Sequence, residues 1–286
     1  MSYTPTAPKQ RQLLALLLLN ANEVVSTGTC IEELWEDAPP NSALSTLQSY
    51  ILQLRRSLRR VPRIGSLQAA RGILETRDGG YLLAVADGEL DADRFWGLVR
   101  EGRGALRHDD ERGSARLAEA LRLWHGAALS DVQRGPVLRA HLVGLEEERV
   151  SVHEQRIAAD LRLGRHQELL GELSGLTVRY PTHESLHAQF MLALYRAGRR
   201  TQALEVQRRL STVLRTELGL DPSPRLRRLH QAILMGDATI DAPADTDGVL
   251  SADRPAPPSG RGAAAASGEL VAAARTARRR EPLLKR

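Results

Sequence analysis

The sequence predicts a mainly α protein in which an N-terminal winged helix-turn-helix with a small β-hairpin wing precedes an all-α domain of tetratricopeptide-like helical repeats. Two observations predict this class: the order of helices, breaks and strands in the first 88 residues, and a 34-residue period between Gly164 and Gly198. We expect a winged helix over 1–88, a helical domain over 89–236 and a disordered tail over 237–286.

Two short helices open the chain. Residues 8–20 begin with a proline, which suits a first helical turn, and continue with mostly apolar residues, so this helix should be largely buried. Residues 26–35 form a second helix, for which Ser26 or Thr27 can act as the N-cap. The two prolines at positions 39 and 40 then break the chain.

Residues 42–60 predict a third, amphipathic helix. Leucine or isoleucine recurs at helical spacing at positions 44, 47, 51, 54 and 58, and this stripe should face the core. The opposite face is polar and basic, and no acidic residue occurs from residue 38 to residue 74. The exposed candidates on and beside that face are Thr46, Ser49, Gln53, Arg56 and Arg60.

Residues 71–85 predict two short strands joined by a turn at residues 77–80. Helix, helix, proline break, basic helix and hairpin follow one another as in a winged helix-turn-helix. Serine, glutamine and arginine on such a helix can read base edges in the major groove, and Arg77 in the hairpin can hold a phosphate. A packed three-helix bundle with a solvated basic face would have a similar sequence, so this pattern leaves both interpretations open.

From residue 91 to residue 236 the pattern is helical throughout. The segments around Gly164 and Gly198 superpose at the tetratricopeptide period of about 34 residues. Each such unit is a helix pair that buries its apolar face only against a neighbour, which predicts a short array of the kind that usually binds protein. Residues 237–268 are rich in small residues and proline and predict disorder, and the basic end of the chain is expected to be a solvated tail.

Residues 183–187, HESLH, match a zinc-hydrolase pattern, in which two histidines bind the metal and a glutamate is the base. Pro181 places His183 in the opening turn of a repeat helix, and both histidines border the side that Phe190 buries, so we interpret them as rim or partly buried residues. Glu146, Glu147 and Glu148 point around a helix and are interpreted as a solvated face.

Nothing else in the sequence nominates an enzyme. No P-loop, Rossmann glycine fingerprint or nucleophile elbow occurs, so we expect no catalytic residue, no metal and no cofactor. The single cysteine, Cys30, excludes internal disulfides and is expected to be a buried apolar residue in a reducing compartment. The longest apolar run, residues 13–19, is too short to span a bilayer, and we expect no membrane partner.

The chain resembles the SARP family, the streptomycete antibiotic regulatory proteins, over about residues 8–235. In the first domain the resemblance rests on PKQRQLLALLLLNANEVVS, IEELWEDAPPNSALSTLQSYILQLRRSLR and GGYLL; in the second it rests on LDADRFWGLV, LRLWHGAAL, LALYRAGR and ELGLDPSPRLRRLHQAIL. The family joins an OmpR-type winged helix to a bacterial transcriptional activation domain, and the nucleotide-binding module of its larger members is missing here.

The resemblance implies an activator of an antibiotic biosynthetic gene cluster, acting in the cytoplasm on the nucleoid. Two copies would bind direct repeats near the promoter −35 element as a homodimer on DNA, and would recruit RNA polymerase through its sigma factor and alpha subunit. By position, residues 41–60 are the recognition helix, the hairpin around Arg77 is the wing, and Glu36, Asp37, Pro39 and Pro40 form a loop facing RNA polymerase.

The alternative is a helical-repeat protein-protein adaptor with a degenerate winged helix, which would bind all DNA sequences weakly. One departure from the family lies in the second helix, where Gly28 should cost about 1 kcal/mol relative to a stronger helix former.

Overall fold

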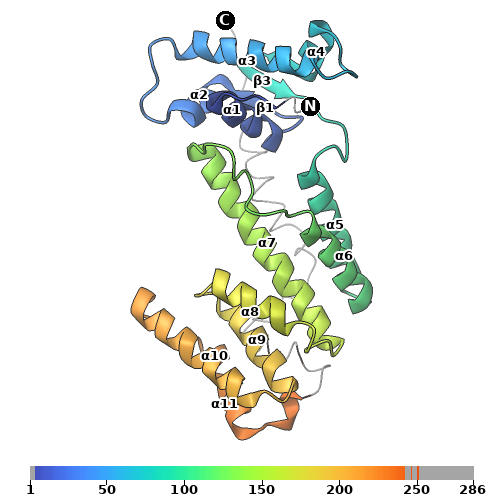
Figure 1. Cartoon of the computed structure of the whole chain (residues 1–286), viewed down its shortest axis with the longest axis vertical. Coiled ribbons are helices and arrows are strands. Elements are labelled where there is room, and N and C mark those ends of the chain that lie inside the picture. Colours follow the sequence, from blue (N-terminus) through green and yellow to red (C-terminus); the bar gives the residue numbers. More distant parts are fainter. Residues whose placement is uncertain (1–3, 242–245, 247–249, 251–286) are drawn as a thin grey trace, which may run out of the picture.

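The computed structural model describes residues 4–241, 246 and 250 (Figure 1). Its N-terminal part is a winged helix in which four helices surround a small sheet. The elements in order are α1 (Pro8–Leu19), β1 (Val24–Ser26), α2 (Thr27–Trp35), α3 (Ala43–Arg59), α4 (Leu67–Ile73), β2 (Leu74–Arg77) and β3 (Gly80–Leu83).

The sheet is antiparallel with the order β1-β3-β2, so β3 lies in the middle. The predicted hairpin is confirmed as β2 and β3, but the sequence prediction missed β1, whose Val25 pairs with Tyr81 of β3. It also missed α4, which ends at Ile73 and occupies the residues where the predicted first strand began. Three-residue strands and seven-residue helices are too short to show a clear period, so tertiary pairing decides them.

Leucines from α1 and the inner stripe of α3 form the core of this domain. Leu47, Ile51 and Leu54 are nearly fully buried, as the helical spacing predicts. The prediction for Leu44 was wrong, since its side chain is 52% exposed at the first turn of α3, beyond the reach of α1 and α2. Cys30 is fully buried, and burial raises the pKa of its thiol to about 12, which keeps it protonated.

The second domain is all helical, as predicted. Its helices are α5 (Asp91–Ala105), α6 (Asp110–Arg122), α7 (Pro136–Arg162), α8 (Leu170–Arg179), α9 (Glu184–Arg196), α10 (Arg200–Val213) and α11 (Pro224–Met235), with a π-turn over Leu214–Leu218 (η1) and a 3₁₀ turn over Ala238–Ile240 (η2). Helices α5, α6 and α7 pack together through Phe95, Val99 and Val152, and the helices from α7 to α11 share a second apolar core.

The 34-residue period corresponds to two matching helix ends. Gly164 follows α7 and Gly198 follows α9, with φ of 76° and 74°. The next residue donates its backbone N–H back into the helix in both cases, from Arg165 to Asp160 O and from Arg199 to Leu194 O. This is a left-handed helix stop that glycine adopts without strain, repeated at the turn from one helix to the next.

The packed part of the helical domain extends past Gly236, where the sequence analysis placed its end. Ile240, Thr246 and Leu250 are all at most 5% exposed, and the Arg196 guanidinium donates to Ile240 O and Thr246 Oγ1. Burial of these three residues requires the folded array, so composition alone did not indicate it. Most of the predicted disordered tail lies outside the described residues.

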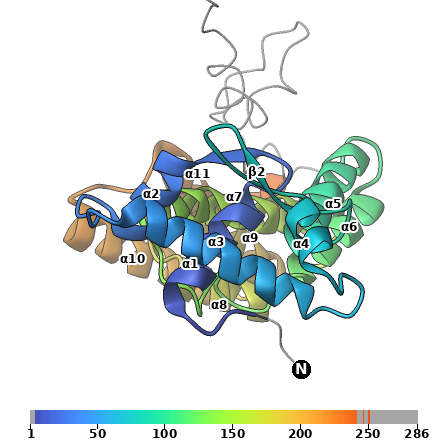
Figure 2. The ribbon, with the colours of Figure 1, turned by 90° about the horizontal axis from the view of Figure 1, so that it is seen from above.

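The molecule is elongated, with the winged helix at one end and α10 and α11 at the other (Figure 1). Helix α3 lies outermost on the winged helix, and Figure 2 shows it crossing that end of the molecule. The 27 residues of α7 span about 40 Å and lead away from the winged helix. None of the described helices is long and apolar enough to cross a membrane.

Candidate nucleic-acid interface

Helix α3 presents a polar, acid-free face to solvent at the tip of the molecule (Figure 2). Its apolar stripe fixes which side is buried, and the last turn carries Arg56 and Arg59, whose charge is favourable near a helix C-terminus. Since no carboxylate lies on α3, its outer face has positive potential and free donors, which is the arrangement that a polyanion requires.

The structure places four of the six predicted DNA-contacting residues on α3 and a fifth, Arg60, at the C-cap of this helix. Ser49, Gln53, Arg56 and Arg60 are exposed, and Thr46 is half-buried. Ser49 Oγ donates to Ser45 O at 2.9 Å, which leaves its lone pairs able to accept from outside. The two arginines at positions 56 and 60 extend the same face toward the C-terminal end of the helix.

Gln53 is the predicted reader that is most engaged within the protein. Its Oε1 accepts a hydrogen bond from Gln10 Nε2, which connects α3 to α1. The side-chain amide of Gln53 keeps its own donors, so a base contact through Nε2 is compatible with this bond. The contact fixes the rotamer of Gln53 on the α1 side of the exposed face.

Arg77 lies apart from the others, at the end of β2 beside the hairpin turn. Its guanidinium pairs with Glu75 Oε2 at 2.5 Å, and the Arg77 side chain is still 55% exposed. A surface pair of this kind contributes little to stability and leaves the remaining guanidinium donors available. The phosphate contact expected of Arg77 stays a prediction.

Arg55 is a residue whose role the sequence did not reveal. It stands on the flank of α3, where its Nε donates to Leu74 O and a terminal nitrogen donates to Thr76 Oγ1, both at 2.8 Å. Burial, and then the charge of Arg71, lower the pKa of Arg55. These two bonds join α3 to β2 and so fix the wing relative to α3.

The loop after α2 contains Glu36, Asp37, Pro39 and Pro40, all of them exposed. Glu36 has φ 53° and ψ −126°, a strained backbone for a residue with a side chain, and its N–H donates to Glu32 O at 2.8 Å. Its carboxylate pairs with Arg139 of α7 at 2.9 Å. The loop thus leaves α2 in a fixed direction, on the side where α7 begins.

A fully buried carboxylate joins the two domains. Glu33 of α2 accepts hydrogen bonds from the backbone N–H of Gly135 at 2.6 Å and of Leu138 at 2.9 Å, at the start of α7. Gln12 of α1 donates its Nε2 to Glu33 O and Oε1. No pattern in the sequence indicates this contact, because Glu33 lies more than 100 residues from Gly135 and Leu138.

The HESLH segment is part of the repeat packing. His187 is 6% exposed, its Nδ1 lies 3.1 Å from His183 O, and burial lowers its pKa. Glu184 accepts the backbone N–H of Ser223 at the start of α11. His183 lies 3.6 Å from Glu154. These contacts connect α9 to α7 and α11, and no group of metal-binding side chains is present in the described part of the chain.

Glu146 and Glu148 are less solvated than the sequence predicted, whereas Glu147 is exposed as predicted. Glu146 accepts from Arg179 and from the hydroxyl of Tyr180, and Glu148 pairs with Arg103 at 2.7 Å. Burial and the Glu146 bond raise the pKa of Tyr180 to about 12. The cluster therefore connects α7 to α5 and α8.

Comparison with known proteins matches both domains. A model of the bacterial transcriptional activator domain matches residues 90–234, and a model described as transcriptional regulatory protein, C terminal, matches residues 4–83. Regulatory protein DnrI of Streptomyces peucetius is 47% identical over 241 residues, covering 84% of this chain and 89% of that protein. Transcriptional regulator RedD of Streptomyces coelicolor is 36% identical, covering 83% of this chain and 67% of that protein.

A solved structure shares the fold of the whole described chain. It is Mycobacterium tuberculosis EmbR in complex with a low affinity phosphopeptide, with a TM-score of 0.75 and 32% sequence identity. The match covers 87% of this chain and 65% of that one.

Proposed function

Because this chain belongs to the SARP family of transcriptional regulators, which are not enzymes, we propose that it is a sequence-specific activator of an antibiotic biosynthetic gene cluster. In this proposal it binds direct repeats near the promoter −35 element and recruits RNA polymerase. The observation that carries the proposal is the exposed, acid-free face of α3 at the tip of the molecule, with the wing fixed beside it.

The dimensions and chemistry of α3 suit the major groove of B-DNA. The groove is about 12 Å wide and admits one α-helix, and 17 residues span about 25 Å along it. Thr46, Ser49, Gln53 and Arg56 are the residues that we propose to contact bases or phosphates. Arg60 and the wing residue Arg77 are the proposed phosphate contacts, which set the position of the protein on the duplex.

The domain arrangement supports recruitment of a protein partner. Helix α7 directs the helical domain away from α3, so the array stays clear of a duplex that occupies the tip (Figure 1). We assign the loop containing Glu36, Asp37, Pro39 and Pro40 to the RNA polymerase side, with the sigma factor and the alpha subunit as partners. Two copies on direct repeats point the same way along DNA, so the homodimer contact is of the head-to-tail type.

Selection from a randomised DNA pool tests the proposal. The purified full-length protein is bound to the pool at near-physiological salt, and the retained DNA is sequenced. A direct repeat in the retained DNA supports sequence reading and identifies target promoters. Retention of no motif by a protein shown to be folded refutes sequence reading and favours the adaptor function, since phosphate contacts alone bind all sequences alike.

A further inference from the structure

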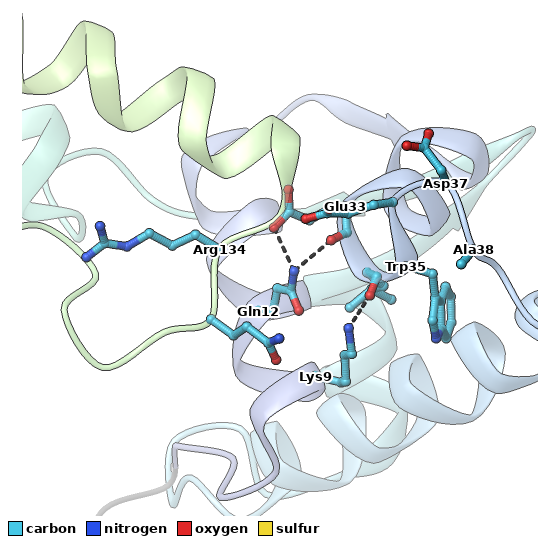
Figure 3. Close-up of a pocket in the computed structure, with 10 residues that line it drawn as sticks. Lys9, Gln12, Glu33, Trp35, Asp37, Ala38 and Arg134 are labelled. Atoms are coloured by element: carbon cyan, nitrogen blue, oxygen red, sulfur yellow. Dashed lines mark hydrogen bonds between the residues drawn. The ribbon is translucent and has the colours of Figure 1, made fainter.

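A pocket of about 400 Å³ lies where the two domains meet (Figure 3). The winged helix contributes side chains from α1, the end of α2 and the loop that follows. The second domain contributes the two residues before Gly135. Its lining residues include Lys9, Gln12, Trp35, Asp37, Gln133 and Arg134.

A buried acceptor without a partner in the described residues lies directly beneath the pocket. Gln12 is 2% exposed, and its Oε1 accepts no hydrogen bond from the described residues. The orientation of the amide is fixed, because Nε2 donates to Glu33 O and Oε1, and a flipped amide would place oxygen against oxygen. Figure 3 shows Gln12 Oε1 turned away from Glu33, on the side of Lys9.

The cationic donors around the pocket are already engaged. Lys9 Nζ donates to Leu34 O. Arg134 donates to Ala128 O and Leu129 O, and its guanidinium points away from the other labelled side chains in Figure 3. Asp37, in contrast, is exposed and forms no ion pair with a described residue. The groups that remain available to a ligand can therefore accept hydrogen bonds and balance a positive charge.

An aromatic wall completes the site. The Trp35 ring lines the pocket and stacks nearly parallel on Tyr50, with ring centroids 6.4 Å apart. A cation over an indole face is attracted by the ring quadrupole, most often when the cation is an arginine. A planar guanidinium has five donors for the acceptors and a flat face for the indole, whereas an ammonium lacks the flat face.

We propose that this pocket receives the guanidinium of an arginine side chain presented by a partner protein. Five of its lining residues (Glu36, Asp37, Ala38, Gln133 and Arg134) are exposed, so an occupant is covered on one side only. Small-molecule sites bury most of their ligand, which this open pocket does not do. A protein partner covers the open side with the surface around its arginine.

The identification of the partner as RNA polymerase rests on the proposed function, since the pocket adjoins the loop assigned to the polymerase side. Gln133 and Arg134 belong to the second domain, so the complete pocket forms only while Glu33 holds the start of α7. Partner binding therefore depends on how the two domains are placed relative to each other.

The first test does not depend on transcription. The full-length protein is titrated with Nα-acetyl-arginine amide and with its neutral isostere Nα-acetyl-citrulline amide, and NMR shifts of the Gln12 side-chain amide and the Asp37 and Gln133 backbone amides are followed. We expect saturable shifts and about tenfold tighter binding of the arginine probe, because its bonds are charge-assisted. Asp37→Asn should remove this preference, and the matched Glu32→Gln, outside the pocket on α2, should keep it.

Equal response to the two probes, or saturable shifts at other residues, overturns the proposal. So does the absence of any shift at the solubility limit of the arginine probe. The small-molecule probe binds whether the natural ligand is a free guanidinium metabolite or an arginine of a protein partner. The second test distinguishes these two ligands.

The second test fills the pocket from within. Ala38→Arg supplies a guanidinium from the exposed loop, and Ala38→Gln is the neutral control. With bacterial RNA polymerase holoenzyme and a selected promoter, Ala38→Arg should lower activation about tenfold, the loss of one charge-assisted contact, while DNA affinity stays within about twofold. Unchanged activation by Ala38→Arg overturns the protein-partner assignment. Failure of the unaltered protein to activate at all refutes the proposed function and leaves the first test valid.

Discussion

The carboxylate of Glu33 caps the helix that begins at Gly135, accepting the N–H of Leu138 at 2.9 Å across the boundary between the two domains. Helix α7 has no side-chain cap of its own. A residue of the winged helix thus satisfies backbone donors that the second domain leaves open, and a negative charge lies at the positive end of a 27-residue helix. Glu33 acts at the joint together with the Glu36–Arg139 ion pair and with Leu138, which is buried in the core of the winged helix.

Replacing Glu33 by alanine should destabilise the whole protein. Gly135 N–H and Leu138 N–H would lose their acceptor in a fully buried site, and Gln12 Nε2 would keep only the backbone oxygen at position 33, which costs about 2 to 4 kcal/mol in the free energy of unfolding. Urea denaturation of the full chain measures this. The control is Glu32→Ala on the exposed side of α2, which should change stability by less than about 0.5 kcal/mol. Equal effects of the two variants would show that the cap is not important.

Two glycines of the same segment should respond oppositely to alanine. A Cβ on Gly135 would lie 2.0 Å from Glu33 O, so Gly135→Ala must open the joint, at a cost of about 3 kcal/mol. A Cβ on Gly144, inside α7, meets nothing within 4 Å, and Gly144→Ala should stabilise by about 1 kcal/mol through helix propensity. Thermal unfolding of both variants is the measurement, and a harmless Gly135→Ala would contradict the described joint.

Arg55→Lys should weaken DNA binding indirectly. The lysine keeps the charge but loses the fork that bonds Leu74 O and Thr76 Oγ1, so the wing becomes mobile relative to α3. We expect a loss of about 1 kcal/mol in unfolding free energy and weaker protection of DNA beneath the wing in a footprinting assay. Arg59→Lys, on the exposed side of the same helix, is the control. A footprint that shrinks equally in both variants would mean that Arg55 has no special positioning role.

Arg56→Ala distinguishes the two kinds of DNA contact. If Arg56 reads guanine, specific binding should weaken by about 1 to 3 kcal/mol and discrimination at one base pair should relax. If it holds a phosphate, all sequences should be affected alike and the salt slope should fall by about 1. Titration of selected and scrambled duplexes at several salt concentrations measures both. The control is Arg112→Ala in α6, which removes the same charge far from α3. Unchanged binding by Arg56→Ala would exclude Arg56 from the interface.

Acid should destabilise the fold through His187. Burial lowers the pKa of this imidazole from 6.5, so the folded state binds the proton more weakly than the unfolded chain does. The contribution of His187 to stability is therefore fully present above pH 6.5. It is lost as the pH falls from 6.5 toward the lowered pKa of His187 in the folded state. His187→Gln keeps a donor for His183 O and should flatten the dependence of the urea midpoint on pH in that window. Identical slopes in the unaltered protein and in His187→Gln would argue against the shift.

The sequence alone determined the elements that repeat a period or carry an unmistakable break. The leucine spacing of α3 predicts its buried and exposed faces, because burial must follow the helical period, and Leu44 fails only because no element lies over its turn. The glycines at 164 and 198 predict the repeat of the second domain, since each stops a helix in the same left-handed conformation. The absence of acids near α3 is likewise visible in the sequence.

The tertiary structure decided everything that depends on pairs of residues distant in the chain. Strand β1 exists because β3 provides a partner, and Glu33 reads as a solvated acid until the start of α7 is placed over it. Arg55 looks like one more positive charge until β2 lies within its reach. The pocket at the joint has the same origin: its lining comes from residues 9–38 and from residues 133 and 134, which only the packing of one domain on the other brings together.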